Sequence, residues 1–215
     1  GKLLSDDGKL ALIVIALDPK TIAGSGLGDA VTEIRSIALN ELKGTGLTVQ
    51  MSGAPVMQHE IRNAVENEEL AGIILRIDSP GGTVSGTADL GNDIRTAAAT
   101  KPVIAFVEDM AASAAFWLAS QAGMVFASST TARVGSIGTF LGLHDLSGLA
   151  AKEGIRPVVI RTSPIKGIGF PGEEITDEQK AELQRVVNDV QAEFVAAVQA
   201  GRNMTEEKVA NVADA

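Results

Sequence analysis

A single hydroxyl, that of Ser113, lies in a stretch of small apolar residues, Asp-Met-Ala-Ala-Ser-Ala-Ala-Phe-Trp at 109–117. The stretch follows a run typical of a buried strand, and the small residues after Ser113 favour a helix. A nucleophile at a strand-to-helix elbow needs small neighbours, because bulk would block both the substrate and the turn. Ser113 is therefore a candidate nucleophile with the amide of Ala114 as an oxyanion donor. The alternative is a serine that only packs at the start of a helix.

A second chemical element is the turn Ser79-Pro80-Gly81-Gly82, which directly follows the run Gly-Ile-Ile-Leu-Arg-Ile-Asp. Two consecutive glycines permit positive φ and expose backbone N–H groups. A strand, a glycine turn and a helix in this order present amides to an anion. The pattern indicates either an ordinary turn or half of an oxyanion hole, with Gly82 as the donor.

A serine hydroxyl is a weak nucleophile and needs a base. Lys166 lies within residues 163–172, Ser-Pro-Ile-Lys-Gly-Ile-Gly-Phe-Pro-Gly, which contain no other charge. A lysine acts as a base only when it is neutral, and burial lowers its pKa, so we expect a desolvated loop. Ser136 is a candidate to hold the lysine amine by a hydrogen bond. The alternatives are His144 as the base, and a lysine with no chemical role.

The elements that must position these residues alternate between strands and helices. The patterns predict helices over 29–42, 56–70, 86–99, 112–120, 146–153 and 177–200, and strands over 10–17, 47–51, 72–77, 102–107, 124–127, 138–143 and 157–161. The last helix is the best marked, because Thr176 and Gln179 form a capping-box pattern and Gly201 follows it. Such alternation predicts an α/β fold with a mostly parallel sheet and βαβ crossovers.

Composition limits the classes of function. The chain has 215 residues, 45% of them hydrophobic, which is enough for a substantial core. Its formal net charge of -9 argues against nucleic acid as a partner. With no cysteine and two histidines we expect neither a metal nor another cofactor. The longest apolar run, 10–17, is far shorter than the roughly 20 residues of a membrane span. We therefore expect a soluble, cytoplasmic chain, or a membrane-associated one if an N-terminal anchor has been removed.

Five blocks in one order carry a family resemblance. They are "GIILRIDSPGGTVSG", "VEDMAASAAFWLAS", "ARVGSIG", "IRTSPIKGIGFPGEEITDEQKAELQ" and "FVAAVQAGRNMTEEKVANVAD". Over about residues 56–215 the chain resembles the signal peptide peptidase A family of serine proteases, including its phage and prophage capsid-type members. The resemblance implies a Clp-protease/crotonase-like fold. It also implies a Ser-Lys dyad in which Ser113 is the nucleophile, Lys166 the base, Ser136 the lysine-positioning residue, and Gly82 and Ala114 the oxyanion donors.

The activity that the resemblance implies is that of a serine endopeptidase acting on an extended peptide or protein, either signal-peptide remnants or phage assembly proteins. It implies a homo-oligomer as well. Three residues depart from the family pattern, since Ala114 and Ala115 stand where many members have glycines and Gly167 where many have an acidic residue. Three alternatives stay open: a Ser-His protease of the Clp type, a crotonase-like acyl-CoA enzyme, and a catalytically inactive assembly subunit.

The two ends of the chain depart from the resemblance. The family continues beyond the terminal Val-Ala-Asp-Ala, so we expect the protease domain, residues 56–215, to be truncated at its C-terminus. Residues 1–55 form a predicted strand-helix-strand segment of unassigned role. This segment resembles a periplasmic segment of resistance-nodulation-division exporters, although no transmembrane helix accompanies it.

Overall fold

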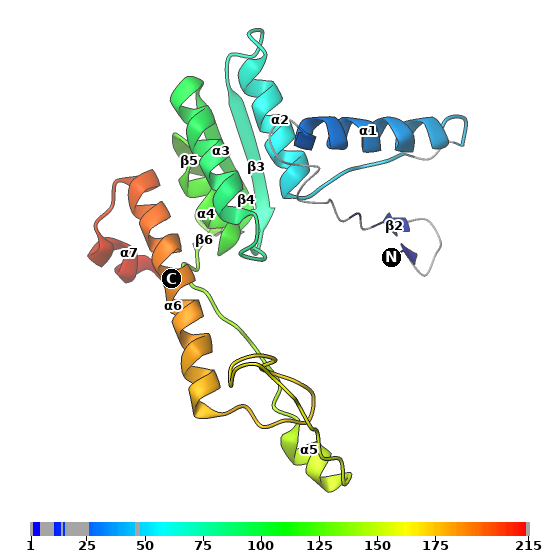
Figure 1. Cartoon of the computed structure of the whole chain (residues 1–215). Coiled ribbons are helices and arrows are strands. Elements are labelled where there is room, and N and C mark those ends of the chain that lie inside the picture. Colours follow the sequence, from blue (N-terminus) through cyan, green and yellow to red (C-terminus); the bar gives the residue numbers. More distant parts are fainter. Residues whose placement is uncertain (1, 5–10, 14, 16–25, 46–47, 214–215) are drawn as a thin grey trace. The chain divides into compact units, whose positions relative to one another are not determined.

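The computed structural model describes residues 2–4, 11–13, 15, 26–45 and 48–213 (Figure 1). The chain divides into two compact units, Gly1–Asn67 and Glu68–Ala215. The expected division between residues 55 and 56 falls near the start of a helix that the structure leaves whole in the first unit.

The first unit contains an antiparallel strand pair and two helices. These are β1 (Lys2–Leu4), β2 (Ala11–Ile13), α1 (Gly26–Glu41) and α2 (Ala54–Glu66). Both predicted helices are confirmed. The strand predicted over 10–17 is confirmed for residues 11–13, and its other residues but Ile15 lie outside the described ones. The strand predicted over 47–51 is wrong for its described residues 48–51, because no strand pairs with them.

The second unit is built on a parallel sheet. Strand β4 (Val103–Ala112) lies between β3 (Ile73–Ser79) and β5 (Met124–Ala127), and its last residues pair with the short strand β6 (Arg133–Gly135). All of these pairs are parallel, as the alternation of strands and helices requires. The predicted α/β fold with βαβ crossovers is confirmed.

Helices α3 (Thr87–Thr100) and α4 (Ala114–Ser120) form the two crossovers, β3 to β4 and β4 to β5. They cover the side of the sheet on which Val103, Ala105 and Val107 are buried. Every second side chain of β4 faces this core, whereas apolar residues on the opposite face of the sheet, Ile74 of β3 and Phe106 of β4, are exposed.

The long helix α6 (Asp177–Arg202) packs on α4, and α7 (Glu206–Ala213) packs on α6. The predicted capping box of α6 is present. The Thr176 hydroxyl accepts from the backbone N–H of Gln179, and the Gln179 side chain accepts from the backbone N–H of Thr176. Trp117 of α4 stacks on Phe194 of α6 with ring centroids 4.9 Å apart. The stacked pair forms a core together with Ile137, Val198 and Val209.

The segment between β6 and α6, residues 136–176, contains one short helix, α5 (Ser147–Lys152), and is otherwise irregular. The strands predicted over 138–143 and 157–161 are wrong, because a strand needs a paired neighbour and neither run has one within the described chain. Their apolar residues remain outside the core, with Phe140 93%, Val158 83% and Ile160 97% exposed. No described helix is both long enough and apolar enough to cross a bilayer.

Candidate active site

Ser113 is the single residue between β4 and α4. Its backbone has φ 54° and ψ −126°, in a region that residues with a side chain rarely occupy. Two hydrogen bonds hold this backbone conformation. The Ser113 N–H donates to the Gly135 carbonyl of β6 at 2.9 Å, and the Ser113 carbonyl accepts the Trp117 N–H at 3.0 Å. The expected strand-to-helix elbow is therefore present, in a conformation that turns the chain sharply at the hydroxyl.

The turn 79–82 lies directly against this elbow. Gly81 has φ 106°, and a Cβ placed there would come 2.7 Å from the Ala112 carbonyl oxygen and 2.7 Å from the Ser113 Cβ. It would also lie 3.0 Å from the amide nitrogen of Ala114. Only glycine allows this approach, since real Cβ contacts do not come so close. Gly81 thus lets the backbone turn reach the elbow that carries Ser113, whereas an added Cβ at Gly82 would meet no atom within 4 Å.

A small pocket of about 80 Å³ opens beside Ser113. Both expected oxyanion donors, Gly82 and Ala114, line it, so two residues 32 positions apart in the sequence meet at one site. The rest of its wall consists of residues that sequence reasoning did not select: Val84, Thr87, Trp117, Gly138, Thr139, Phe140 and Phe194. Of these, only Phe194 had a signal in the sequence, as part of the apolar stripe of a helix.

The far end of α4 is fastened to α6. Arg202 donates through Nε to the Ser120 carbonyl at 3.0 Å, and through Nη2 to the Ala122 carbonyl. Burial lowers the pKa of Arg202, and the side chain stays charged because the ordinary value is so high. Gln121 donates to the Ala197 carbonyl at 3.0 Å. These bonds satisfy carbonyls that the end of a helix leaves unpaired, and they fix a helix of only seven residues.

The remaining expected residues lie apart from this pocket. Ser136 follows the Gly135 that binds Ser113, has φ 52° and is exposed. Lys166 and His144 are also exposed, and neither lines the pocket. The desolvated environment expected for Lys166 is not found in the single chain, because its loop projects from the fold. Within the described residues no hydrogen bond joins Lys166 to Ser113 or Ser136.

The segment that carries Lys166 is bonded to the first turn of α6 and to itself. Gln179 of α6 donates to the Pro164 carbonyl at 2.8 Å. Within the segment, Asp145 accepts the Ile175 N–H at 3.3 Å and the Ser147 N–H at 2.9 Å. Hydrogen bonds from Ser147, with a further one from Ile175, hold the pKa of Asp145 below its usual value. A second pocket of about 350 Å³ lies between this segment and α6, lined by Leu141, Leu143, Asp145, Ile175, Lys180, Leu183, Gln184 and Val187.

No group of three or more potential metal-ligating side chains gathers in the part of the chain that the structure describes. Residues 95–215, more than half of the chain, match the family model Peptidase family S49. The chain belongs to peptidase family S49.

Relatives of this S49 chain are named as proteases. A protease of Methanocaldococcus jannaschii is 28% identical over 216 residues, which covers 99% of this chain and 69% of the relative. The signal peptide peptidase SppA of Enterococcus faecium is 25% identical over 72% of this chain and 45% of its own length. Capsid assembly protease C of Escherichia phage lambda is 30% identical over 70% of this chain and 34% of its own length.

The resemblance to the signal peptide peptidase A family, including its phage members, is confirmed by these relatives. The S49 chain spans about a third to two thirds of the lengths of these relatives. The alignment with the archaeal protease covers 99% of this chain and so includes its N-terminal residues. A solved enoyl-CoA hydratase/isomerase family protein from Silicibacter pomeroyi shares 13% identity at a TM-score of 0.32, over 74% of this chain and 83% of that one. That likeness is too distant to bear on the fold.

Proposed function

We propose that the chain is a serine endopeptidase in which Ser113 is the nucleophile and Lys166 the general base. The observation that carries the proposal is the strained elbow of Ser113, with the glycine turn packed against it and a pocket beside it. Strain of this kind costs about 1–3 kcal/mol and persists where surrounding structure enforces it, most often at active sites. Membership of peptidase family S49 supports the same chemistry.

The reaction begins when the Ser113 Oγ attacks the carbonyl carbon of the scissile peptide and passes its proton to the neutral Lys166 amine. The amides of Gly82 and Ala114 stabilise the oxyanion, each donor contributing about 3–4 kcal/mol in comparable sites. Collapse expels the amine, which takes the proton from the lysine, and leaves an acyl-serine. Water then attacks this ester with the same lysine as base and restores the hydroxyl.

Within one chain, the helix α6 keeps the lysine away from the serine. Phe194 lines the Ser113 pocket, whereas Gln179 holds Pro164 of the Lys166 loop at 2.8 Å. These two residues are 15 positions apart on one continuous helix, a span of about 22 Å. Two residues from Pro164 to Lys166 add at most about 7 Å, and the lysine stem does not bridge the remainder. The dyad therefore forms between two copies of the chain.

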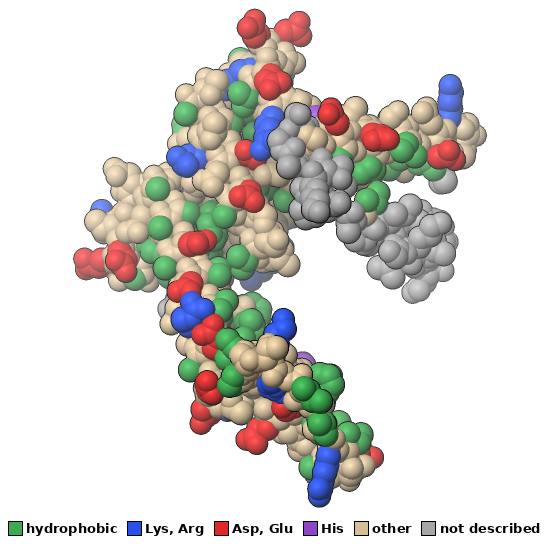
Figure 2. All heavy atoms as spheres, in the orientation of Figure 1, with side chains coloured by type: hydrophobic (Ala, Val, Ile, Leu, Met, Phe, Trp, Pro, Cys, Tyr) green, Lys and Arg blue, Asp and Glu red, His purple; other side chains and the backbone are tan. Residues whose placement is uncertain are grey.

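The exposed apolar residues of segment 136–176 favour such a homo-oligomer. Phe140, Val158 and Ile160 are almost fully exposed, and Figure 2 shows hydrophobic side chains gathered along this segment. Contiguous apolar surface of this kind marks protein contacts. Its irregular runs read as strands in the sequence, and a neighbouring copy would supply the partner that they lack. Burial in that interface would also remove Lys166 from water.

The substrate is an extended peptide with a small apolar side chain next to the cleaved bond. The pocket beside Ser113 is walled by Val84, Trp117 and Phe194 and is too small for a large side chain. Signal-peptide remnants and phage assembly proteins both offer such segments, and relatives of this chain are named for a signal peptide peptidase and a capsid assembly protease.

The proposal is tested by peptide cleavage and by labelling of Ser113 with a fluorophosphonate. We expect Ser113→Ala and Lys166→Ala each to lose about 10⁴-fold or more in kcat, and His144→Ala to behave as the wild type. Loss in His144→Ala alone would replace the dyad by a Ser-His pair. Turnover of a thioester without labelling of Ser113 would indicate an acyl-CoA enzyme. If the protein assembles but Ser113 is not labelled at any pH from 6 to 10, the chain is an inactive subunit.

Mixing the two inactive variants tests the arrangement between copies. A mixed oligomer of Ser113→Ala and Lys166→Ala chains contains some sites with both an intact serine and an intact lysine. We expect part of the activity to return after the variants are dissociated and reassembled together. If the mixture stays inactive while wild-type chains recover by the same procedure, the dyad is not shared between copies.

A further inference from the structure

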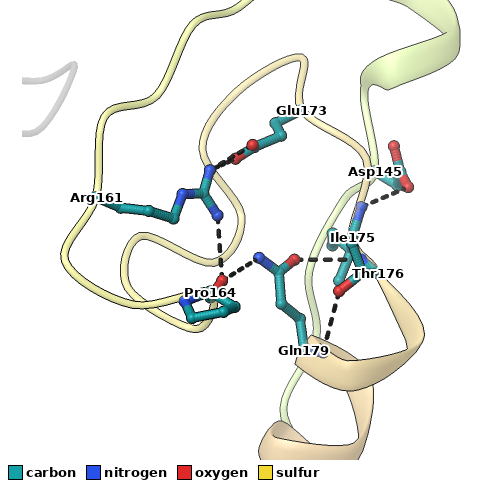
Figure 3. Close-up of polar contacts among 7 residues, drawn as sticks. All are labelled: Asp145, Arg161, Pro164, Glu173, Ile175, Thr176 and Gln179. Carbon is teal, nitrogen blue, oxygen red and sulfur yellow. Dashed lines mark hydrogen bonds and ion pairs between the residues drawn. The ribbon is translucent and has the colours of Figure 1, made fainter.

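The loop that carries Lys166 is closed at its base by an ion pair. Arg161 and Glu173 flank residues 162–172, and one guanidinium nitrogen of Arg161 bonds both carboxylate oxygens of Glu173 (Figure 3). The Arg161 side chain is 16% exposed and that of Glu173 31%. A pair so shielded from water is screened less than a surface pair, and it fixes the distance between the two ends of the loop.

The same loop is tied to α6 through Pro164. Its carbonyl accepts from Gln179 Nε2 at 2.8 Å and from the other terminal nitrogen of Arg161 at 3.2 Å. Gln179 is almost fully buried and forms the capping box with Thr176, so its side chain has no freedom to leave. Figure 3 shows Arg161 and Gln179 approaching the Pro164 carbonyl from different elements, with Glu173 on the far side of the Arg161 guanidinium.

Inside the loop the backbone is wound into tight turns. The Lys166 N–H donates to the Ser163 carbonyl at 3.1 Å, and the Phe170 N–H donates to the Gly167 carbonyl at 3.2 Å. Gly167 and Gly169 have φ of 83° and 79°, which bends the chain directly after the lysine. A loop with this winding has a definite shape only while its ends are held together, since the turns make few contacts of their own.

We infer that Arg161 and Glu173 are positioning residues that hold the Lys166 loop in the shape in which it presents its amine to the serine. This inference rests on the proposed role of Lys166. Neither residue touches the substrate or the reacting atoms, and both act through the backbone at the loop base. Misplacing a catalytic group by about 1 Å costs about 10²-fold in rate, so a loosened base lowers kcat while leaving substrate binding at the pocket intact.

The test compares Arg161→Gln and Glu173→Gln with Arg185→Gln. The control also removes an arginine that pairs with carboxylates, those of Glu182 and Asp189, on the exposed surface of α6. We expect kcat to fall about 10–100-fold in each loop-base variant with KM unchanged. The expected kcat of Arg185→Gln is that of the wild type. Arg161→Lys keeps the positive charge but lacks the planar set of guanidinium donors, so we expect its kcat to lie between those of Arg161→Gln and the wild type.

A second measurement separates positioning from a purely structural role. Each loop-base variant is combined with Lys166→Ala, and the rate of Ser113 labelling by the fluorophosphonate is measured. If the ion pair acts through the lysine, the loop-base substitution has no further effect once the lysine is gone. Additive losses, or losses that follow the fall in the thermal midpoint, would overturn the inference.

The two proposals fail in different ways. If Lys166→Ala is as active as the wild type, the proposed dyad fails and this inference with it. If Lys166→Ala is inactive but Arg161→Gln and Glu173→Gln match the Arg185→Gln control, the dyad stands and the positioning role alone is refuted.

Discussion

Gly201 sits where α6 crosses the end of α4, and its replacement by alanine tests how closely these helices must approach. A Cβ at this position would overlap the Ser120 carbonyl oxygen, and it would lie 2.9 Å from the Ser120 carbonyl carbon and 3.0 Å from Nε2 of Gln121. The carbonyl belongs to the backbone and also accepts from Arg202. The contact is therefore relieved only by moving one helix away from the other.

The expected cost follows from three contributions. Alanine gains about 1 kcal/mol over glycine inside a helix. Overpacking costs about 1–3 kcal/mol, and the weakened charged hydrogen bonds of Arg202 cost about 1.5–3 kcal/mol, less the screening that a half-exposed guanidinium receives. We expect Gly201→Ala to destabilise the second unit by about 2–3 kcal/mol, which lowers its thermal midpoint by about 4–12 °C.

The assay is thermal and urea unfolding, with Gly148→Ala as the matched control. Gly148 lies in α5 with no atom within 4 Å of an added Cβ, so its replacement should leave stability unchanged or slightly raised. Because α4 begins directly after Ser113, we also expect slower serine labelling in Gly201→Ala. A Gly201→Ala chain as stable as the Gly148→Ala control would refute the close approach of α4 and α6.

Three further outcomes are expected. Gly81→Ala should lower kcat/KM by about 10²-fold in a peptide-cleavage assay, because the added Cβ pushes the turn away from Ser113; wild-type turnover would contradict the packing described. Phe194→Ala should cost about 3–5 kcal/mol and alter the fluorescence of Trp117, the single tryptophan, and an unchanged spectrum would argue against the stacked pair. Hydrogen bonds from neighbouring groups hold the pKa of Asp145 below its usual value, so they stabilise the fold above about pH 4 and are lost as the pH falls through the lowered pKa. Asp145→Asn should therefore be less stable than the wild type at pH 7 and equal to it in acid, and a difference independent of pH in urea unfolding would contradict this.

Local signals were sufficient to predict the elbow and the long helix. The small residues around Ser113 and the glycines of the turn after a strand are local patterns, so the sequence alone indicates the turn and the elbow. The contact that requires glycine at position 81 comes from another element and is known only from the structure. The capping box of Thr176 and Gln179 is equally local. Residues 138–143 and 157–161 have strand composition, but a strand exists only with a partner, and composition does not say whether the partner is in the same chain.

The environment of Lys166 could not be predicted for a related reason. The absence of charge around it indicated burial, yet burial depends on what packs over the loop, and among the described residues Lys166 is exposed. The ion pair of Arg161 and Glu173 had one signal that could have found it: the two charges flank residues 162–172, in which Lys166 is the single charged residue. Residues of opposite charge at the two ends of a turn-rich loop are candidates for closing it.

The left-handed backbone at Ser113 also limits what evolution can place there. Threonine carries the same hydroxyl, but a β-branched residue is strongly disfavoured at φ 54°, so the chemically nearest exchange is closed on conformational grounds. Cysteine and glycine are not β-branched, so this restriction does not apply to them. If Ser113 is the nucleophile that we propose, the conformation disfavours exchange between the two small hydroxyl residues at this position.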